Sequence, residues 1–378
     1  MTRPAVIHVD LAALHHNCQR IREFSPNSNV LGIVKANAYG HGAIDIAQAL
    51  AQPGSGVDML AVACIDEAVS LRRAGITMPI LLLEGCFHPE EYQLASQLNL
   101  QVVFHCQQQL DELQRQNLAS PITAWLKIDT GMHRLGFLPD EAEQSYQHLL
   151  ADPCIAPHIV LMTHIASADF PDNPHTTAQI QLFQQLHQRL QAKFNINITT
   201  SIGNSATIIA WPAGWSDIVR PGIMMYGCSP FASATAQDDQ LKPVMTLKSA
   251  VIAVREVNQG SFVGYGGRWQ ASARSIIATV AIGYGDGYPS SVQDGTPVLV
   301  NGNLAYIAGR VAMDMLTVDV TQASSVNSVN IGDEVVLWGE SLDVNLIARH
   351  ANTIGYELIT RMPQRVPKIY ISSDNDNL

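Results

Sequence analysis

Short apolar runs alternate with amphipathic stretches along the first part of the chain. The amphipathic stretches at 43–52, 65–75, 89–99 and 176–190 have helical spacing, and Leu11 to Phe24 predicts a further helix ahead of them. The apolar runs are continuous, which is typical of strands buried on both faces of a parallel sheet. There are eight, at about 31–36, 58–64, 79–85, 100–106, 123–129, 158–164, 199–204 and 217–227.

Eight such strands alternating with helices predict an α/β fold, a (β/α)8 barrel of the TIM type. The alternative is a doubly wound open sheet. No GxGxxG sequence opens a helix after the first strand, which counts against that alternative.

The pattern changes after about residue 235. A polar loop at 232–240 is followed by short β-type runs separated by turn residues, among them GRVAMDM at 309–315, and one helix is predicted at 343–361. The sequence therefore predicts two domains, a barrel at 1–235 and a mainly β C-terminal domain at 236–378.

Charge and cysteine content narrow the classes of partner and compartment. The 22 lysines and arginines against 33 acidic residues give a net charge of −11, and a surface so poor in cations argues against nucleic acid and anionic membranes. The six cysteines show no CxxC and no metal-like spacing, which favours free thiols in a reducing cytosol over a metal site. The sequence shows no signal-peptide pattern and no apolar run near the ~20 residues of a transmembrane helix. We therefore expect a cytoplasmic protein.

Lysines are scarce in the predicted barrel, where residues 1–235 contain Lys35, Lys127 and Lys193. Lys35 and Lys127 each end a predicted strand, at the face where barrel active sites lie. A lysine in such a place can form a structural ion pair. When apolar neighbours shield it, the lysine can instead lose its proton and attack a carbonyl group, as Schiff-base chemistry requires.

Other polar residues stand at the ends of the later strands. Arg134 follows the fifth predicted strand, and His164 ends the sixth. Ser205 follows the seventh at the start of a predicted helix, and Arg220 and Gly222 follow the eighth. Barrels often bind phosphate on the loops after strands seven and eight, and a hydroxyl beside helix N-terminal N–H groups suits that anion. The set predicts a cationic, phosphate-binding barrel mouth.

Two glycine-rich segments of the C-terminal part each place a tyrosine between glycines. They contain Tyr265 in VGYGGRW and Tyr284 in IGYGDGYP. Either motif fits a tight turn with a packed aromatic ring. A tyrosine on an exposed loop can also act as an acid or a base when a neighbouring cation lowers its pKa from ~10.

Taken together, the motifs resemble those of alanine racemases. They are VKANAYGHG, KIDTGMHRLGF, GNSAT, VRPGIMMYG, VGYGGRW, IGYGDGYP, GRVAMDM and GYELITR, in the family's order from about residue 5 to 370. The resemblance implies an N-terminal (β/α)8 barrel, a C-terminal β domain, the cofactor pyridoxal 5′-phosphate (PLP), and homodimers whose active sites draw on both chains. It implies interconversion of L- and D-alanine, which supplies D-alanine for peptidoglycan or degrades it.

Carried over position by position, the resemblance implies a role for each motif residue. Lys35 and Tyr265 match two catalytic bases on opposite faces of the cofactor-bound substrate, with the tyrosine supplied by the partner subunit. Arg134 and Met313 match contacts of the substrate carboxylate. The cofactor-binding positions besides Lys35 are Tyr39, His164, Asn204, Ser205, Arg220, Gly222, Ile223 and Tyr356. The supporting positions are Lys127, which some members carbamylate, Tyr284 at the substrate entrance, and Asp314.

The sequence departs from the family pattern at three places. His133 replaces a frequent glycine, Ala312 a frequent cysteine, and Gly355 a frequent asparagine or alanine. Two alternative functions remain, a racemase of broader amino-acid range and a PLP-dependent amino-acid decarboxylase of the same architecture. The decarboxylases use a cysteine in the C-terminal domain, whereas no cysteine follows Cys228 here. A barrel-only PLP-binding protein would lack the C-terminal domain altogether.

Overall fold

The computed structural model describes residues 3–326 and 328–372. The chain forms two compact units, each with its own main sheet. The barrel unit contains Cys18–Ala38 and Gly42–Met225. The β unit contains the residues up to Asn17, the short segment Tyr39–His41, and the residues from Tyr226 onward.

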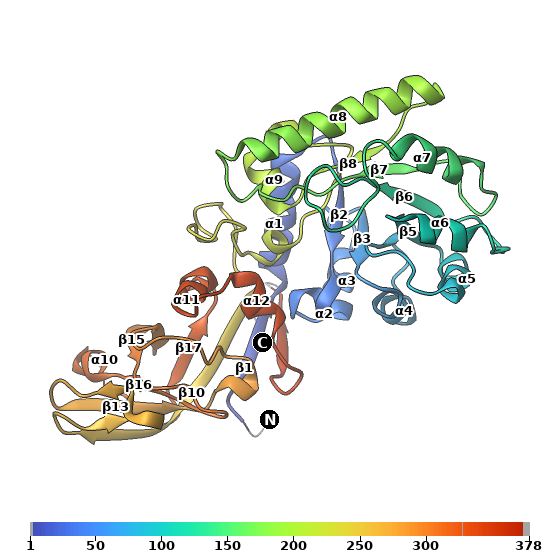
Figure 1. The fold of residues 1–378 in the computed structure, drawn as a ribbon. Coiled ribbons are helices and arrows are strands. Elements are labelled where there is room, and N and C mark those ends of the chain that lie inside the picture. The colour runs from blue at the N-terminus through green and yellow to red at the C-terminus, as the bar shows by residue number, and fades with distance from the viewer. Residues whose placement is uncertain (1–2, 327, 373–378) are drawn as a thin grey trace. The chain divides into compact units, whose positions relative to one another are not determined.

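Eight parallel strands close into a barrel in the barrel unit (Figure 1). Nearly all of their residues are buried, as the continuous apolar runs predict. The last strand pairs with the first, which closes the ring and confirms the predicted (β/α)8 architecture. The strands are β2 (Asn29–Ile33), β3 (Met59–Val62), β4 (Ile80–Leu82), β5 (Leu100–Phe104), β6 (Thr123–Lys127), β7 (Val160–Met162), β8 (Thr200–Ser201) and β9 (Ile218–Val219).

Helices connect the barrel strands. The predicted helix ahead of the barrel is α1 (Leu11–Phe24). Within the described ranges, no helix combines the length and the apolar character that crossing a bilayer requires. The remaining helices of this half are α2 (Lys35–Tyr39), α3 (Ala43–Leu50), α4 (Ile65–Arg73), α5 (Pro89–Gln97), α6 (Gln107–Leu113), α7 (Ala142–Ala151), α8 (Pro174–Phe194), α9 (Ser205–Ala210), η1 (Pro212–Gly214) and η2 (Ile223–Tyr226).

The β unit is built around one eight-stranded sheet in the order β13–β16–β15–β14–β17–β10–β1–β18. The long strand β10 (Met245–Val257) also pairs with β13, so six of the strands form a ring, with β1 and β18 attached to it. The other elements are β11 (Phe262–Val263), η3 (Tyr265–Gly267), β12 (Trp269–Gln270), β13 (Ser275–Val280), η4 (Tyr284–Asp286), β14 (Pro297–Val300), β15 (Asn303–Ile307), β16 (Leu316–Asp319), α10 (Thr321–Val326) and β17 (Glu334–Trp338).

Strand β1 (Val6–Asp10) belongs to the β unit, although the sequence analysis assigned residues 1–235 to the barrel. It pairs antiparallel with β10 and parallel with β18 (Lys368–Ile371), so segments far apart in the sequence lie side by side. Its residues alternate between buried and half-buried. Such an alternation predicts a strand but not its partner, because the pairing is set by contacts distant in sequence.

The helix predicted at 343–361 is wrong as a single element. The structure has α11 (Val344–His350) and α12 (Gly355–Thr360) instead. Asn352 between them takes a left-handed conformation, with φ of 54°, and Ile354 is extended. A left-handed residue ends the backbone hydrogen-bond ladder of a helix, and asparagine tolerates that conformation better than most residues.

The strand predicted at GRVAMDM is also wrong. Residues 309–315 form a loop between β15 and β16. Gly309 has φ of 94°, which only glycine adopts readily. The loop carbonyls of Ala312 and Met313 accept hydrogen bonds from the N–H groups of Tyr284 and Gly285, at 3.0 and 2.8 Å, instead of joining a sheet ladder.

Candidate active site

The barrel residues that the sequence analysis selected lie at the carboxyl ends of the strands. Lys35 comes two residues after β2, Lys127 is the last residue of β6, and His164 comes two residues after β7. Parallel strands of a barrel end at one face, so these side chains share the end where barrel enzymes place their chemistry. The set is Lys35, Lys127, Arg134, His164, Asn204, Ser205, Arg220, Gly222 and Ile223.

Arg220 is a buried cation held by neutral partners. Its Nη1 donates to Ser201 Oγ at 2.6 Å, and its Nη2 donates to the carbonyl of Thr163 at 2.7 Å and contacts Nδ1 of His164 at 3.4 Å. Burial lowers the pKa of Arg220 to about 10, which leaves it charged at neutral pH. Because a guanidinium can only donate, Nδ1 of His164 accepts, and the imidazole then carries its proton on Nε2.

Ser205 is placed to bind an anion with its hydroxyl. It is the first residue of α9, it is buried, and Asn204 before it caps the helix by accepting from the N–H of Thr207 at 3.0 Å. Ser205 Oγ accepts the N–H groups of Gly222 at 3.0 Å and Met224 at 3.4 Å. The oxygen is the acceptor in both contacts, so the hydroxyl hydrogen can point to a ligand oxygen.

The segment after Lys35 has an unusual backbone. Ala36, Asn37, Ala38 and Tyr39 all have positive φ, between 51° and 56°. Left-handed conformation costs about 1 kcal/mol or more per non-glycine residue, and runs of it are rare. The sequence reads as an ordinary strand end followed by a glycine-loosened turn, and it gives no signal of this strain. Such strain concentrates at functional sites.

The cations at this end of the barrel shift one another's pKa values. Burial lowers the pKa of Lys35; Arg134 adds to the shift, while Glu84 and Glu67 oppose it. Burial and then Arg220 lower the pKa of Lys127 to about 8. The same two causes hold the pKa of His164 well below its ordinary value, so its imidazole is neutral at pH 7. The site is a buried positive region suited to an anionic ligand.

Arg134 is exposed on a loop that Asp129 fixes. Oδ1 of Asp129 accepts the N–H groups of Gly131, Met132 and His133, at 2.9, 2.9 and 3.1 Å. His133 has φ of 55°, the conformation that favours glycine. The departure from the family pattern at His133 therefore adds strain, and the three hydrogen bonds to Asp129 offset it.

Aromatic rings pack together in the β unit. The ring of Tyr39 stacks on Tyr226 at 5.0 Å between centroids and lies 6.2 Å from Tyr356, and His41 stacks on Tyr226 at 4.6 Å. Burial raises the pKa of Tyr39 to about 12, so its hydroxyl remains a donor at neutral pH. Tyr39 and Tyr356 are the cofactor-binding positions that the resemblance assigns to this unit.

The predicted substrate residues of the β unit are exposed. Tyr265 in η3 is 71% exposed, Met313 is 54% exposed and Tyr284 in η4 is 47% exposed. A pocket of about 360 Å³ lies beside Tyr265 and is also lined by Arg310, Met315 and others. Tyr265 and the exposed Met315 line this pocket together, and a contiguous exposed apolar patch is typical of an interaction surface.

A network of charges ties down the loops that carry Tyr284 and Met313. Asp286 is fully buried. Its carboxylate accepts a hydrogen bond from Nη2 of Arg3 at 2.6 Å and lies 2.9 Å from Nε of Arg365. Asp314 is half-exposed and pairs with Arg365 at 2.8 Å and Arg3 at 3.4 Å. Asp314, a predicted supporting residue that directly follows Met313, thus holds this loop through its ion pairs with the two arginines.

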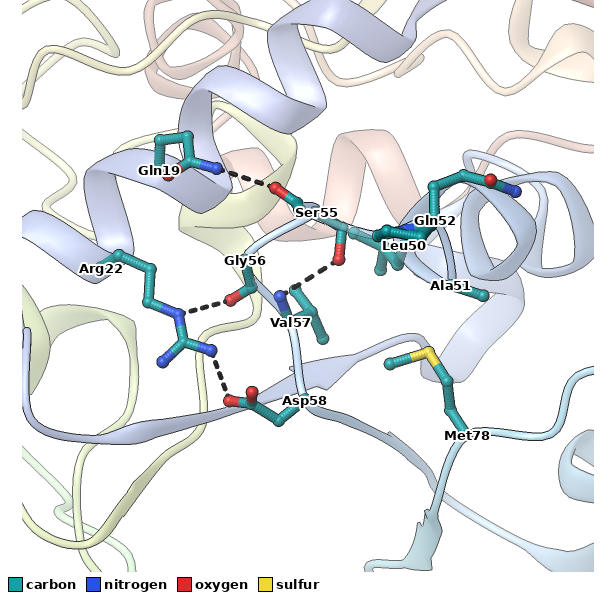
Figure 2. Close-up of a pocket in the computed structure, with 12 residues that line it drawn as sticks. Gln19, Arg22, Leu50, Ala51, Gln52, Ser55, Gly56, Val57, Asp58 and Met78 are labelled. Carbon is teal, nitrogen blue, oxygen red and sulfur yellow. Dashed lines mark hydrogen bonds and ion pairs between the residues drawn. The ribbon is translucent and has the colours of Figure 1, made fainter.

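A different pocket, of about 650 Å³, lies at the amino-terminal ends of β3 and β4 (Figure 2). Figure 2 shows that its polar groups bind one another. Arg22 donates to the carbonyl of Gly56 at 2.9 Å and pairs with Asp58 at 2.6 Å. Gln19 donates to the carbonyl of Gly54, which is not labelled there, at 3.0 Å. This end of a barrel serves stability, so we assign the active site to the cationic end.

The groups that hold the predicted residues in place were not predicted from the sequence. Ser201 and Thr163 orient Arg220, and Asp129 shapes the Arg134 loop. Ser201 is the last residue of β8 and Thr163 directly follows the neighbouring strand β7, so the parallel pairing of β7, β8 and β9 was the available signal. Arg3 and Arg365 carried no such signal, because the chain's fold alone brings them to Asp286.

Comparison with known proteins agrees with the motifs. The alanine racemase N-terminal domain matches residues 9–230, and the alanine racemase C-terminal domain matches residues 244–370. The alanine racemase of Pseudoalteromonas atlantica is 46% identical over 98% of this chain and 100% of its own length, and that of Haemophilus influenzae is 44% identical over 98% and 99%. The crystal structure of the biosynthetic alanine racemase of Pseudomonas aeruginosa matches with a TM-score of 0.91 at 41% identity, over 98% of this chain and 100% of that one. The chain belongs to the alanine racemase family.

Proposed function

We propose that the protein interconverts L- and D-alanine with PLP bound at the carboxyl end of the barrel. The observation that carries the proposal is the buried positive region there, with Arg220 beside a neutral His164 and with Lys35 at the end of β2. The family match favours a racemase over the decarboxylase alternative. The product supplies D-alanine for peptidoglycan, or the same reaction degrades it.

The barrel residues fit the chemistry of PLP. Ser205, with a hydroxyl hydrogen left to donate, and the backbone around Gly222 and Ile223 suit its phosphate. Arg220, a donor that cannot accept a proton, suits its ring nitrogen and would leave that nitrogen unprotonated. Lys35 suits its carbonyl group because burial favours the reactive neutral amine. The resemblance adds Asn204, Tyr39 and Tyr356 to these contacts. PLP, when bound, draws electron density from the amino acid and makes its α-hydrogen acidic.

Two bases on opposite faces of the substrate carry out the inversion. One base alone would return the proton mostly to the face that lost it. Lys35, with its lowered pKa, serves one face. Tyr265 serves the other, and Nε2–H of His164 is the group that would hydrogen-bond its oxygen and link it to Arg220.

The substrate carboxylate is bound by Arg134 and by the backbone at Met313. Arg134 offers a planar pair of N–H donors on a loop fixed by Asp129, which suits a carboxylate. Burial, then Arg220 and Arg134, lower the pKa of Lys127 to about 8, so about a tenth of it is neutral at pH 7, the form that carbamylation requires. Tyr284, on the adjoining loop, lines the entrance.

The working molecule is a homodimer in the cytoplasm. The exposed Tyr265 ring beside a pocket supports a partner subunit that covers it. All six cysteines are free thiols and four of them are buried, which supports a reducing compartment.

The test is hydrogen exchange at the substrate α-carbon. The protein is incubated with PLP and L-alanine in D2O, and the α-hydrogen signal and optical rotation are followed together. Loss of both the α-hydrogen signal and the optical rotation supports the proposal. The same assay with serine and other amino acids measures the range of substrates. Release of carbon dioxide would indicate a decarboxylase, and full retention of the α-hydrogen with PLP bound would refute racemisation.

A further inference from the structure

Glu67 is a carboxylate that the proposed reaction does not use, and it binds the chain directly beside Lys35. Its Oε1 accepts the N–H of Ala36 at 2.7 Å, and its Oε2 accepts the N–H of Ala63 at 2.8 Å. Ala36 follows Lys35, and Ala63 follows the last residue of β3. One side chain therefore joins the ends of two neighbouring strands of the barrel.

The position of Glu67 in its own helix makes this contact notable. It is the third residue of α4, where a glutamate commonly bonds back to the N-cap residue of the same helix. Here the N-cap residue Cys64 has no side-chain cap, and both oxygens of Glu67 reach N–H groups outside the helix. The carboxylate is thus committed to the strand ends rather than to its helix.

The N–H of Ala36 needs such a partner because of the backbone that follows. Ala36 opens the left-handed run, so its N–H has left the ladder of β2. Later residues of the run bond to the chain just before and after it, since Ala38 donates to the carbonyl of Val34 and Asn37 accepts from the N–H of Gly42, both at 2.9 Å. Glu67 ties the first left-handed residue to a different strand.

We propose that Glu67 is a positioning residue for Lys35, one whose carboxylate pins the first residue of the left-handed run and so fixes the direction in which the Lys35 side chain leaves the strand. This inference rests on the proposed function in taking Lys35 as the PLP-binding base. A base displaced by about 1 Å loses rate steeply because the reacting atoms no longer align. Burial lowers the pKa of Lys35, and the negative charge of Glu67 raises it in part.

The experiment compares Glu67→Gln with Asp66→Asn in the PLP-loaded protein. Asp66 is the exposed neighbour in the same first turn of α4, so its substitution removes the same charge without touching the strand ends. Glutamine keeps one oxygen but replaces the other with an NH2 group, which cannot accept an N–H. We expect kcat to fall about 10- to 100-fold in Glu67→Gln, with KM within about twofold, and Asp66→Asn to match the parent.

A second readout does not depend on activity. Amide hydrogen exchange resolved at Ala36 should be slow in the parent, although Ala36 is exposed, and at least about tenfold faster in Glu67→Gln. Equal exchange and equal kcat in Glu67→Gln and Asp66→Asn would overturn the inference. So would fast exchange at Ala36 in the parent, a result that needs no variant to fold.

A third variant separates the effect of side-chain length at position 67 from the effect of its charge. Glu67→Asp keeps the charge but is one methylene shorter, so it cannot span both N–H groups. Impairment like that of Glu67→Gln supports positioning, whereas parental activity in Glu67→Asp would show that charge alone matters and overturn the inference. A parent chain that neither binds PLP nor racemises alanine would refute the proposed function instead, and the exchange at Ala36 would then decide the inference alone.

Discussion

Lys127 is a buried lysine surrounded mainly by other cations. It ends β6 and is 8% exposed, and Arg220, Arg134 and Lys35 all act with burial to lower its pKa. Asp129 opposes them only weakly, as the last of the causes. Holding this side chain in the folded protein therefore costs free energy whenever it carries a proton.

Lys127 should make the folded protein more stable as pH rises. The folded pKa is about 8 against an ordinary 10.5, so between those values the unfolded chain holds a proton that the folded chain has released. Stability then rises with pH, by about 2.5 kcal/mol from pH 7 to pH 10 for this group. Urea unfolding of the parent and Lys127→Met at both pH values measures the difference. Parallel pH dependence in the two proteins would contradict the prediction.

The position of the candidate residues at the ends of barrel strands could be predicted from the sequence, but the size of their pKa shifts could not. Lys35 and Lys127 stood out because lysine is scarce and both end an apolar run. The pKa of each is lowered first by burial and is then shifted by charged side chains from separate strands, Arg134 among them. Those neighbours are set by the closure of the barrel, which no local pattern describes.

Helix α12 begins at a glycine for a packing reason. A Cβ at Gly355 would lie 2.4 Å from Oδ1 of Asn345 and 2.6 Å from Sγ of Cys228. Asn345 cannot easily move, because its buried side chain donates to the carbonyls of Ser229 and Ala234, both at 3.1 Å. The glycine that departs from the family pattern at this position thus lets α12 approach α11 and the chain at Cys228 closely.

Gly355→Ala should destabilise the protein, although alanine normally favours a helix by up to about 1 kcal/mol over glycine. Overpacking against Asn345 and Cys228 should cost about 1–3 kcal/mol and outweigh that gain. Denaturant unfolding measures the sign. A stabilised variant would show that the contact relaxes without cost.

The two carboxylates of the charge network at η4, Asp286 and Asp314, should contribute unequally to the stability of the folded protein. Asp286→Ala removes a buried carboxylate from Arg3, Arg365 and the N–H of Gly283, and should cost about 2–4 kcal/mol. Asp314 faces the same two arginines from a half-exposed position where water screens the charges, so Asp314→Ala should destabilise the protein clearly less than Asp286→Ala does. Thermal unfolding of the two variants provides the comparison. Equal losses would mean that burial does not govern this network.

At the scale of the whole molecule, the sequence predicted the barrel and the β domain better than it predicted which of the two units each segment joins. The barrel strands are buried on both faces, so their apolar runs mark them one by one. Strand β1 and the segment Tyr39–His41 fall into the β unit, which the simple division at residue 235 does not anticipate. Both are short and have no distinctive sequence pattern, and only pairing with β10 and stacking on Tyr226 reveals where they belong.

Sharing of residues between subunits can be tested by mixing two inactive variants. Lys35→Ala removes one proposed base, and Tyr265→Phe removes the other while keeping the ring. If each site takes Lys35 from one subunit and Tyr265 from the other, a mixed dimer has one intact site and one site that lacks both bases. Random exchange at equal concentrations yields half mixed dimers, so about a quarter of the parental activity should return.

Each variant incubated alone is the control, and it should stay inactive under the same exchange conditions. Tyr265 supports the expected outcome because its ring is 71% exposed and lies beside a pocket in the β unit. A site formed within one chain would leave every subunit of the mixture missing one base. Activity would then not return at any mixing ratio, and such a result, with subunit exchange verified by mass, would refute the shared site while leaving the assignment of Lys35 intact.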